Sequence, residues 1–269
     1  MRLKILFNPI GFIASLIVIS GCSLAHPTAA PAAQNGIPIL ASPIRFVLPA
    51  GLGRGVIAEN FDVVTDQTGA PWDIAPAHLQ LAIQGYTFVD SYLVPQLFIY
   101  PAQEYAAANP TAAESIKRLQ AVLAKPDLQY TNDVLPYVPF YNAGQVFAAQ
   151  EKVLQFKGGS GLRIITQYAQ DVSPINNSGL FYHFEGLTAD GKYYVIVILP
   201  TNLPSLPGDN NPASSVPAGG IPFPSNKTPG SSFEDYFKQV TDLINNSPAD
   251  RFTPPINTLD ALIQSISFQ

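Results

Sequence analysis

The stretch that decides the fold runs from Val153 to Pro200, beginning VLQFKGGSGLRIITQYAQ and ending GLFYHFEGLTADGKYYVIVILP. Turn-forming residues separate its apolar runs: Gly158–Gly161 in the first half and Asp190-Gly191 in the second. Glycine reaches the positive φ angles of tight hairpins without steric cost. The pattern predicts an antiparallel meander core at 153–199, with strands near 153–158, 161–169, 179–187 and 192–199.

The last strand of this meander indicates how the sheet is covered. Its residues 192–199 (KYYVIVIL) are apolar at both odd and even positions. Successive side chains of a strand point to opposite faces, so both faces of this strand require burial. Apolar residues at helical spacing predict helices at 111–125, 232–245 and 258–266. We therefore expect an α+β fold in which helices cover both faces of an antiparallel sheet.

Further strands are predicted on the N-terminal side of this core. Apolar or alternating runs at 44–49, 56–61, 78–86 and 96–101 are typical of strands. The glycine-rich segment Gly51–Gly55 is followed by a strand-like run rather than a helix. A phosphate-binding loop requires the helix, so we interpret this segment as a plain turn.

The leader, residues 1–21, has basic residues at its start, then an apolar run, then small residues. This arrangement is typical of a secretory signal peptide. The run is too short and too interrupted for a good membrane span. At Ile19, Ser20, Gly21 and Cys22 the chain resembles the lipobox of bacterial lipoproteins, with Ile19 where leucine is commoner. An ordinary signal peptide with a chance cysteine is the alternative.

The lipobox resemblance implies lipid attachment at Cys22, which is the sole cysteine of the chain. It implies a diacylglyceryl group on the Cys22 sulfur, cleavage after Gly21, and often acylation of the new amino group. Two or three acyl chains anchor a protein stably. The implied location is the cell membrane or the outer membrane, with the protein facing away from the cytoplasm.

The predicted domain organisation follows the composition. Residues 1–21 form the signal peptide, and residues 22–43 form an uncharged, Ala/Pro-rich tether that cannot fold alone. Residues 44–269 form a single globular α+β domain. A Pro-rich insertion at 201–231 interrupts this domain, and such insertions are usually functional loops or disordered.

The charge balance argues against nucleic acid as a partner. The net charge is −5, and it falls to about −7 when Arg2 and Lys4 leave with the leader (−5 minus 2). Nucleic-acid binding needs a basic patch, as does a polybasic contact with anionic lipid. The three histidines, His26, His78 and His183, show no metal-ligand spacing. We therefore predict neither a metal nor a cofactor.

The candidate binding surface is the aromatic stretch 130–142, YTNDVLPYVPFYN. Exposed aromatic side chains often anchor interfaces. The alternative interpretation is a loop whose rings cap one edge of the sheet. The candidate residues are Tyr130, Tyr137, Phe140 and Tyr141.

The catalytic alternative depends on His183 and Glu185, which share one face of a predicted strand. Across a tight Asp190-Gly191 turn, that face would meet the apolar Ile196 and Ile198. The members of a Ser/His/acid set meet in space rather than in sequence, so spacing does not exclude one. The Gly-x-Ser-x-Gly elbow of many hydrolases is absent from the sequence.

The order of elements resembles the plan of PsbP/Mog1-like domains, with an opening strand IRFVLP at 44–49 and a closing helix LDALIQSISF at 259–268. The segments 161–168 and 180–188 also resemble those of uncharacterised bacterial lipoproteins, a family that implies no activity. Three functions remain open. The first is a lipid-anchored, non-enzymatic envelope protein that binds or supports another component. The second is a carrier of a small apolar ligand in a cavity lined by Tyr182, Phe184 and Tyr193. The third is a hydrolase.

Overall fold

The computed structural model describes residues 35–86, 91–126, 131, 133–224 and 232–269. These residues belong to the compact unit Gln34–Gln269. The lipobox, Cys22 and Tyr130 lie outside the described residues. The part of the chain that is described contains no helix that is both long enough and apolar enough to span a membrane.

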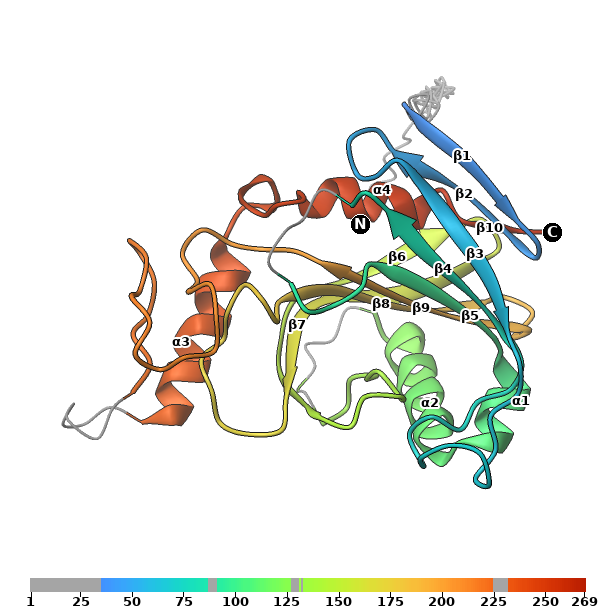
Figure 1. Ribbon diagram of the computed structural model, residues 1–269, viewed down its shortest axis with the longest axis horizontal. Helices are drawn as coiled ribbons and strands as arrows, with labels where there is room; N and C mark the ends of the chain where they lie inside the picture. The colour runs from blue at the N-terminus through green and yellow to red at the C-terminus, as the bar shows by residue number, and fades with distance from the viewer. Residues whose placement is uncertain (1–34, 87–90, 127–130, 132, 225–231) are drawn as a thin grey trace, which may run out of the picture. The chain divides into compact units, whose positions relative to one another are not determined.

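The larger of two sheets has seven antiparallel strands in the order β3-β4-β5-β9-β8-β7-β6 (Figure 1). The predicted meander is confirmed, because β6 to β9 are successive neighbours in this sheet. Gly158 and Gly191 have the positive φ angles expected of their turns, 91° and 68°. The strands are β3 (Gly55–Phe61), β4 (His78–Gln84), β5 (Gln96–Pro101), β6 (Gly144–Phe156), β7 (Gly159–Ala169), β8 (Phe181–Thr188) and β9 (Tyr193–Pro200).

Strand β6 begins at Gly144, well before the predicted start at residue 153. The register of β6 against β7 shifts between Ala149 and Lys152. Gln150 lies in this bulge with a φ of 57°, and its side-chain amide donates to Ile244 O and Ser247 O at the end of helix α3. A bulge breaks the alternation of apolar residues, so the first half of this strand lacked the expected pattern.

A smaller antiparallel sheet, not predicted from the sequence, has the order β1-β2-β10. Its strands are β1 (Gly36–Ala41), β2 (Ile44–Pro49) and β10 (Ser267–Phe268). The predicted strand at 44–49 is confirmed, but β1 falls within the residues assigned to the tether. The boundary at residue 44 was therefore wrong. Strand β1 is short and contains Pro38, so only its pairing with β2 identifies it as a strand.

The three predicted helices are confirmed, and α1 is an addition. Asn109 caps α2 by accepting from Thr111 N and Ala112 N, and Ser232 caps α3 by accepting from Asp235 N. Phe233, the first residue of α3, is 47% exposed, although the apolar pattern of this helix would place its side chain on the buried face. The helices are α1 (Ala102–Ala108), α2 (Pro110–Ala124), α3 (Phe233–Asn246) and α4 (Ile256–Gln264), with a 3-10 turn at Ala249–Arg251.

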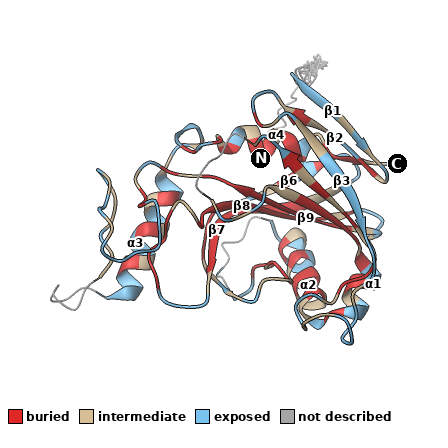
Figure 2. Cartoon of the chain, in the orientation of Figure 1, coloured by how far each residue is buried: buried red, intermediate tan, exposed pale blue. Residues whose placement is uncertain are grey.

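Two hydrophobic cores lie on opposite faces of the large sheet, which confirms the prediction that both faces are covered (Figure 2). On one face, α1 and α2 pack against the sheet, for example through Leu119. On the other face, α3, α4 and the small sheet contribute residues such as Ile244, Leu262 and Phe46. Alternate residues of β9 belong to different cores, Ile196 to the first and Val197 to the second.

The described part of the Pro-rich insertion, residues 201–224, contains no helix and no strand. Its first residues are nevertheless held against the domain. Leu203 and Leu206 are buried, and Asn177 Nδ2 donates to the carbonyl oxygens of both. The beginning of the insertion is therefore part of the core rather than a surface loop.

Candidate functional site

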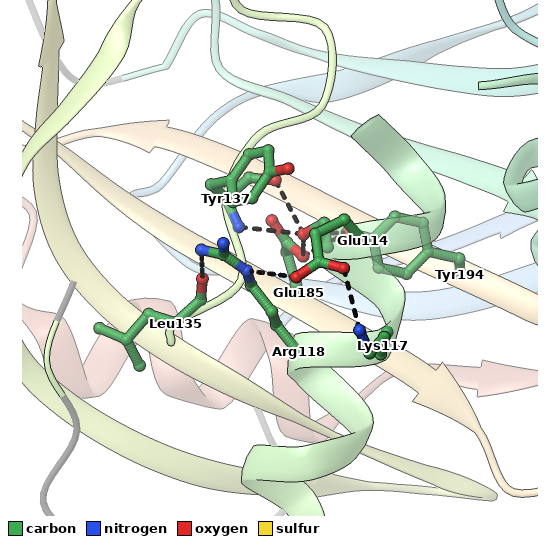
Figure 3. A network of polar contacts seen from close by, with 8 residues as sticks. Glu114, Lys117, Arg118, Leu135, Tyr137, Glu185 and Tyr194 are labelled. Atoms are coloured by element: carbon green, nitrogen blue, oxygen red, sulfur yellow. Dashed lines mark hydrogen bonds and ion pairs between the residues drawn. The ribbon is translucent and has the colours of Figure 1, made fainter. Parts of the chain in front are cut away.

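A cluster of buried polar side chains lies between helix α2 and the large sheet. Glu185 on β8 accepts a hydrogen bond of 2.8 Å from Ser115 Oγ on α2. Its same oxygen accepts from the Tyr194 hydroxyl on β9 (Figure 3). His183 Nε2 lies 3.0 Å from the other oxygen, Glu185 Oε1. We call Ser115, His183, Glu185 and Tyr194 the α2 cluster. None of these residues is more than 1% exposed.

The neighbours of His183 and Glu185 match the sequence prediction. In the register of β8 with β9, His183 lies opposite Ile198 and Glu185 lies opposite Ile196. The surroundings are therefore largely apolar. Burial, and then the charge of Glu185, raise the pKa of Tyr194 well above its ordinary value. Tyr194 therefore remains a neutral donor near neutral pH.

The contacts of the α2 cluster do not follow the order that hydrolysis requires. A nucleophilic serine needs a base within hydrogen-bonding reach, and a third group then orients that base. Here Ser115 contacts Oε2 of the acid while His183 approaches Oε1, so the acid stands between serine and histidine. Neither ring nitrogen of His183 makes an aligned hydrogen bond within the described residues. The cluster is also closed to solvent, so it offers no path for a substrate.

Ser115 has a second role, which is to hold the loop that carries the aromatic stretch 130–142. We call this loop the aromatic loop. Its hydroxyl lies 2.9 Å from both the backbone nitrogen and the carbonyl oxygen of Tyr137. Further along the loop, Val138 N donates to the hydroxyl of Tyr168 on β7 at 2.9 Å. The loop is therefore fixed at two successive residues by side chains of a helix and a strand.

The predicted binding residues Tyr137, Phe140 and Tyr141 lie in this loop and are partly buried against the α2-side core. The Phe140 ring packs on Phe98 with centroids 4.7 Å apart. The Tyr141 ring meets Tyr168 edge-on at 5.1 Å. These contacts favour the interpretation in which the rings cap the sheet.

An open pocket of about 470 Å³ adjoins the loop, and we call it the loop pocket. The Arg118 guanidinium lies over the Tyr137 ring, 5.0 Å from its centroid, and Arg118 Nε donates to Glu114 at 3.0 Å. Gln145 Oε1 accepts from the Tyr168 hydroxyl at 3.0 Å. Its Nε2 is buried without a partner in the described part of the chain. The lining residues are Arg118, Asp133, Tyr137, Ala143, Gly144, Gln145 and Tyr168.

Sequence reasoning identified Tyr137 but missed Arg118, Gln145 and Tyr168. Arg118 looked like an ordinary surface charge of a helix, and Gln145 precedes the predicted start of its strand. A second pocket of about 350 Å³ shares Ala143 and Tyr168 with the loop pocket. The two pockets therefore adjoin each other at Ala143 and Tyr168.

On the opposite face, a second polar cluster ties helix α4 to the sheet. Arg163 on β7 donates to both carboxylate oxygens of Asp260, at 3.2 and 3.3 Å. The Tyr182 hydroxyl donates to Asp260 at 3.0 Å, and Arg163 also donates to the carbonyl oxygen of Gln150 in the β6 bulge. We call Arg163, Tyr182 and Asp260 the α4 cluster. All three are buried.

The three aromatic residues of the carrier hypothesis are buried to different degrees. Tyr182 and Phe184 are 0% exposed within the core. Tyr193 is only partly buried and stacks on Phe268 with centroids 4.9 Å apart. Tyr182 and Phe184 both belong to the core on the α4 side of the sheet, where Phe184 meets Phe156 edge-on with ring centroids 6.2 Å apart.

The described residues contain no group of three or more His, Cys, Asp or Glu side chains placed to hold a metal ion. The fold and the site define an α+β domain that carries an open pocket beside an aromatic loop. Comparisons with known protein families, with curated proteins and with solved structures find no match.

Proposed function

We propose that this chain is a lipid-anchored protein of the cell envelope that acts by binding rather than by catalysis. The lipobox residues Ile19 to Cys22 support the anchor. The loop pocket supports the binding role, because Tyr137 of the aromatic loop lines it. Its place would be the cell membrane or the outer membrane, facing away from the cytoplasm.

The observation that carries the binding role is the unpaired amide nitrogen of Gln145 beside this pocket. A buried donor without a partner is costly, and a ligand oxygen would satisfy it once the Gln145 side chain turns toward the pocket. Ser115 and Tyr168 fix the loop on either side, so the pocket wall is already formed before a ligand arrives. A small molecule with a hydrogen-bond acceptor, or an acceptor group on an envelope component, fits this arrangement.

The two other functions have less support. The hydrolase hypothesis has a serine, a histidine and an acid near one another, but in the wrong contact order and sealed from solvent. The carrier hypothesis has less support because Tyr182 and Phe184 are core side chains with no exposed surface, whereas Tyr193 is only partly buried. The sheet between helices and the closing helix α4 support the PsbP/Mog1-like plan, which we keep as part of the proposal.

Replacing Cys22 by serine tests the anchor. The serine oxygen cannot accept the diacylglyceryl group that the lipobox resemblance implies for the sulfur. We expect Cys22→Ser to move the protein from the membrane fraction to the soluble fraction and to abolish incorporation of labelled palmitate. Ser23→Ala is the matched control and should leave both unchanged. A Cys22→Ser protein that still sediments with membranes and carries label would refute the anchor.

Native mass spectrometry of the full chain, purified from its own envelope, tests the binding role. We expect a mass excess that disappears on denaturation. Gln145→Leu should reduce the occupied fraction by about tenfold, since one hydrogen bond to a ligand is lost. Gln155→Leu is the control, because Gln155 is an exposed residue of the same strand β6. Equal occupancy in both variants would remove the loop pocket as the binding site.

A further inference from the structure

Exposed apolar side chains gather near the point where the chain enters the globular unit. Of the twelve large apolar side chains exposed in the described residues, five lie between Ile37 and Val63, so their distribution is uneven. Single exposed apolar residues need no explanation, but a group on neighbouring elements marks a contact surface. The five, with their exposed fractions, are Ile37 (41%), Leu40 (75%), Ile57 (56%), Phe61 (37%) and Val63 (60%).

Four of these side chains belong to the edge strands of the two sheets, and Val63 follows two residues after the end of β3. Strand β1 is the outer strand of the small sheet, and β3 is the outer strand of the large sheet. The two strands contact each other, and both are largely exposed (Figure 2). In β1, Ile39 and Ala41 pack against the core, so Leu40 between them points away from it. We call β1 and β3 together the open edge.

The sequence that precedes β1 indicates what covers the open edge. Only residues 23–35 separate Cys22 from Gly36 at the start of β1. Thirteen residues reach no more than about 45 Å even when fully extended. An acyl anchor at Cys22 would therefore hold the open edge near the bilayer at a high effective concentration, where even a weak contact is occupied.

We propose that the open edge rests on the lipid surface to which Cys22 is anchored, with Leu40 and Ile57 reaching the boundary between head groups and acyl chains. This inference rests on the proposed anchor. The chain is acidic overall, so the contact is apolar rather than electrostatic. Edge strands carry unpaired backbone groups, which have to stay hydrated. The strands therefore lie at the level of the head groups, and only side chains go deeper.

The single cysteine makes a direct test possible. Once Cys22 is acylated, a cysteine introduced by Leu40→Cys is the only free thiol of the chain. We would attach an environment-sensitive fluorophore there and place the full acylated chain in vesicles of phosphatidylethanolamine and phosphatidylglycerol. Nitroxide-labelled lipid is the quencher. We expect a blue-shifted emission that the quencher lowers by at least about twofold, because the label lies within the interface.

Val172→Cys is the matched control, because Val172 is also exposed (60%) but lies in the loop between β7 and β8. Its label should emit as in water and resist the quencher. Equal, water-like emission from both positions would overturn the inference. A blue shift at Leu40 that depends on protein density, and not on the quencher, would also overturn it and indicate a second copy of the chain.

Sedimentation of the same vesicles separates this inference from the proposal on which it rests. If the acylated chain does not sediment with vesicles, the anchor itself is wrong. If it sediments but the Leu40 label is not quenched, the anchor stands and the docking surface is wrong. In a second variant, Leu40→Asp, a label at Ile57→Cys should lose most of its quenching while sedimentation is unchanged.

Discussion

The two buried polar clusters lie on opposite faces of the same sheet, and they are satisfied to different degrees. In the α4 cluster, the carboxylate of Asp260 receives two hydrogen bonds from Arg163 and one from Tyr182. In the α2 cluster, the carboxylate of Glu185 receives neutral donors on one oxygen only. The other oxygen and both ring nitrogens of the neighbouring His183 lack aligned partners among the described residues.

This difference separates two ways of holding a helix to a sheet. In the α4 cluster Asp260 balances the buried charge of Arg163, so removing Asp260 leaves that charge uncompensated, whereas Asp260 itself also pairs with the more exposed Lys152. The α2 cluster joins a carboxylate to hydroxyl groups, and it also positions the loop through Ser115. Its contacts are more replaceable, because a neutral side chain accepts the same hydrogen bonds.

Alkaline pH should produce the largest effect, and it should act on both faces. Burial raises the pKa of Tyr182 and Tyr194 well above the ordinary value, and the same holds for Tyr100 and Tyr168. Above pH 10 the unfolded chain releases phenolic protons that the folded chain keeps. The stability from the neutral phenols is therefore complete below pH 10 and falls as the pH rises further.

Each such tyrosine costs about 1 kcal/mol between pH 10 and 11 and about 1.4 kcal/mol for each further pH unit, so four cost about 4 kcal/mol between pH 10 and 11 and more above that. Urea unfolding followed by circular dichroism at several pH values measures this loss. Tyr182→Phe and Tyr194→Phe should each make the pH dependence shallower by the same amount. Unequal changes would mean that one of the two rings is not buried as described.

The next largest effect should come from Asp260→Asn, which removes the charge that balances Arg163. Arg163 is only 5% exposed, so it would be left buried without a counter-charge. We expect a loss of about 3–5 kcal/mol in the free energy of unfolding. Asp242→Asn on α3 is the control, because its partner Lys238 is exposed, and it should cost less than about 1 kcal/mol. A similar loss of unfolding free energy in both variants would show that the α4 cluster does not stabilise the fold more than an exposed ion pair does.

The smallest effect should come from Glu185→Gln, the same chemical change on the other face. The amide oxygen of glutamine can accept from Ser115 and Tyr194, so we expect a loss of about 1 kcal/mol or less in the free energy of unfolding. The comparison with Asp260→Asn is made by urea unfolding under the same conditions. A loss as large as that of Asp260→Asn would mean that Glu185 makes a contact that the amide of glutamine cannot replace.

The sequence predicted those parts of the fold that local patterns encode. The turns at Gly158 and Gly191 defined the meander, and Ser232 marked the start of α3. The apolar pattern of β9 indicated that both faces are covered. The small sheet was missed because β1 contains Pro38 and β10 has only two residues. Neither strand has a recognisable pattern without its partner β2.

Only one contact of the two polar clusters, that between His183 and Glu185, could be predicted from the sequence. His183 and Glu185 stand two residues apart on one strand, so their shared face followed from strand geometry. Ser115 lies 70 residues away from Glu185, and Asp260 lies 97 residues away from Arg163. Contacts over such separations depend on the packing of whole elements, which spacing along the chain does not reveal.

The pairing of β10 with β2 has a consequence for the order of folding. The hairpins between β6 and β9 join residues that are close in sequence, so they form at little entropic cost. The bond from Arg45 Nε to Ser267 Oγ instead closes a loop of 222 residues. The pairing of β10 with β2 is therefore expected to form last, after the large sheet has brought the two ends of the domain together, whereas the β1–β2 hairpin is local. A chain whose synthesis is not complete lacks β10, so one edge of its β2 is still unpaired.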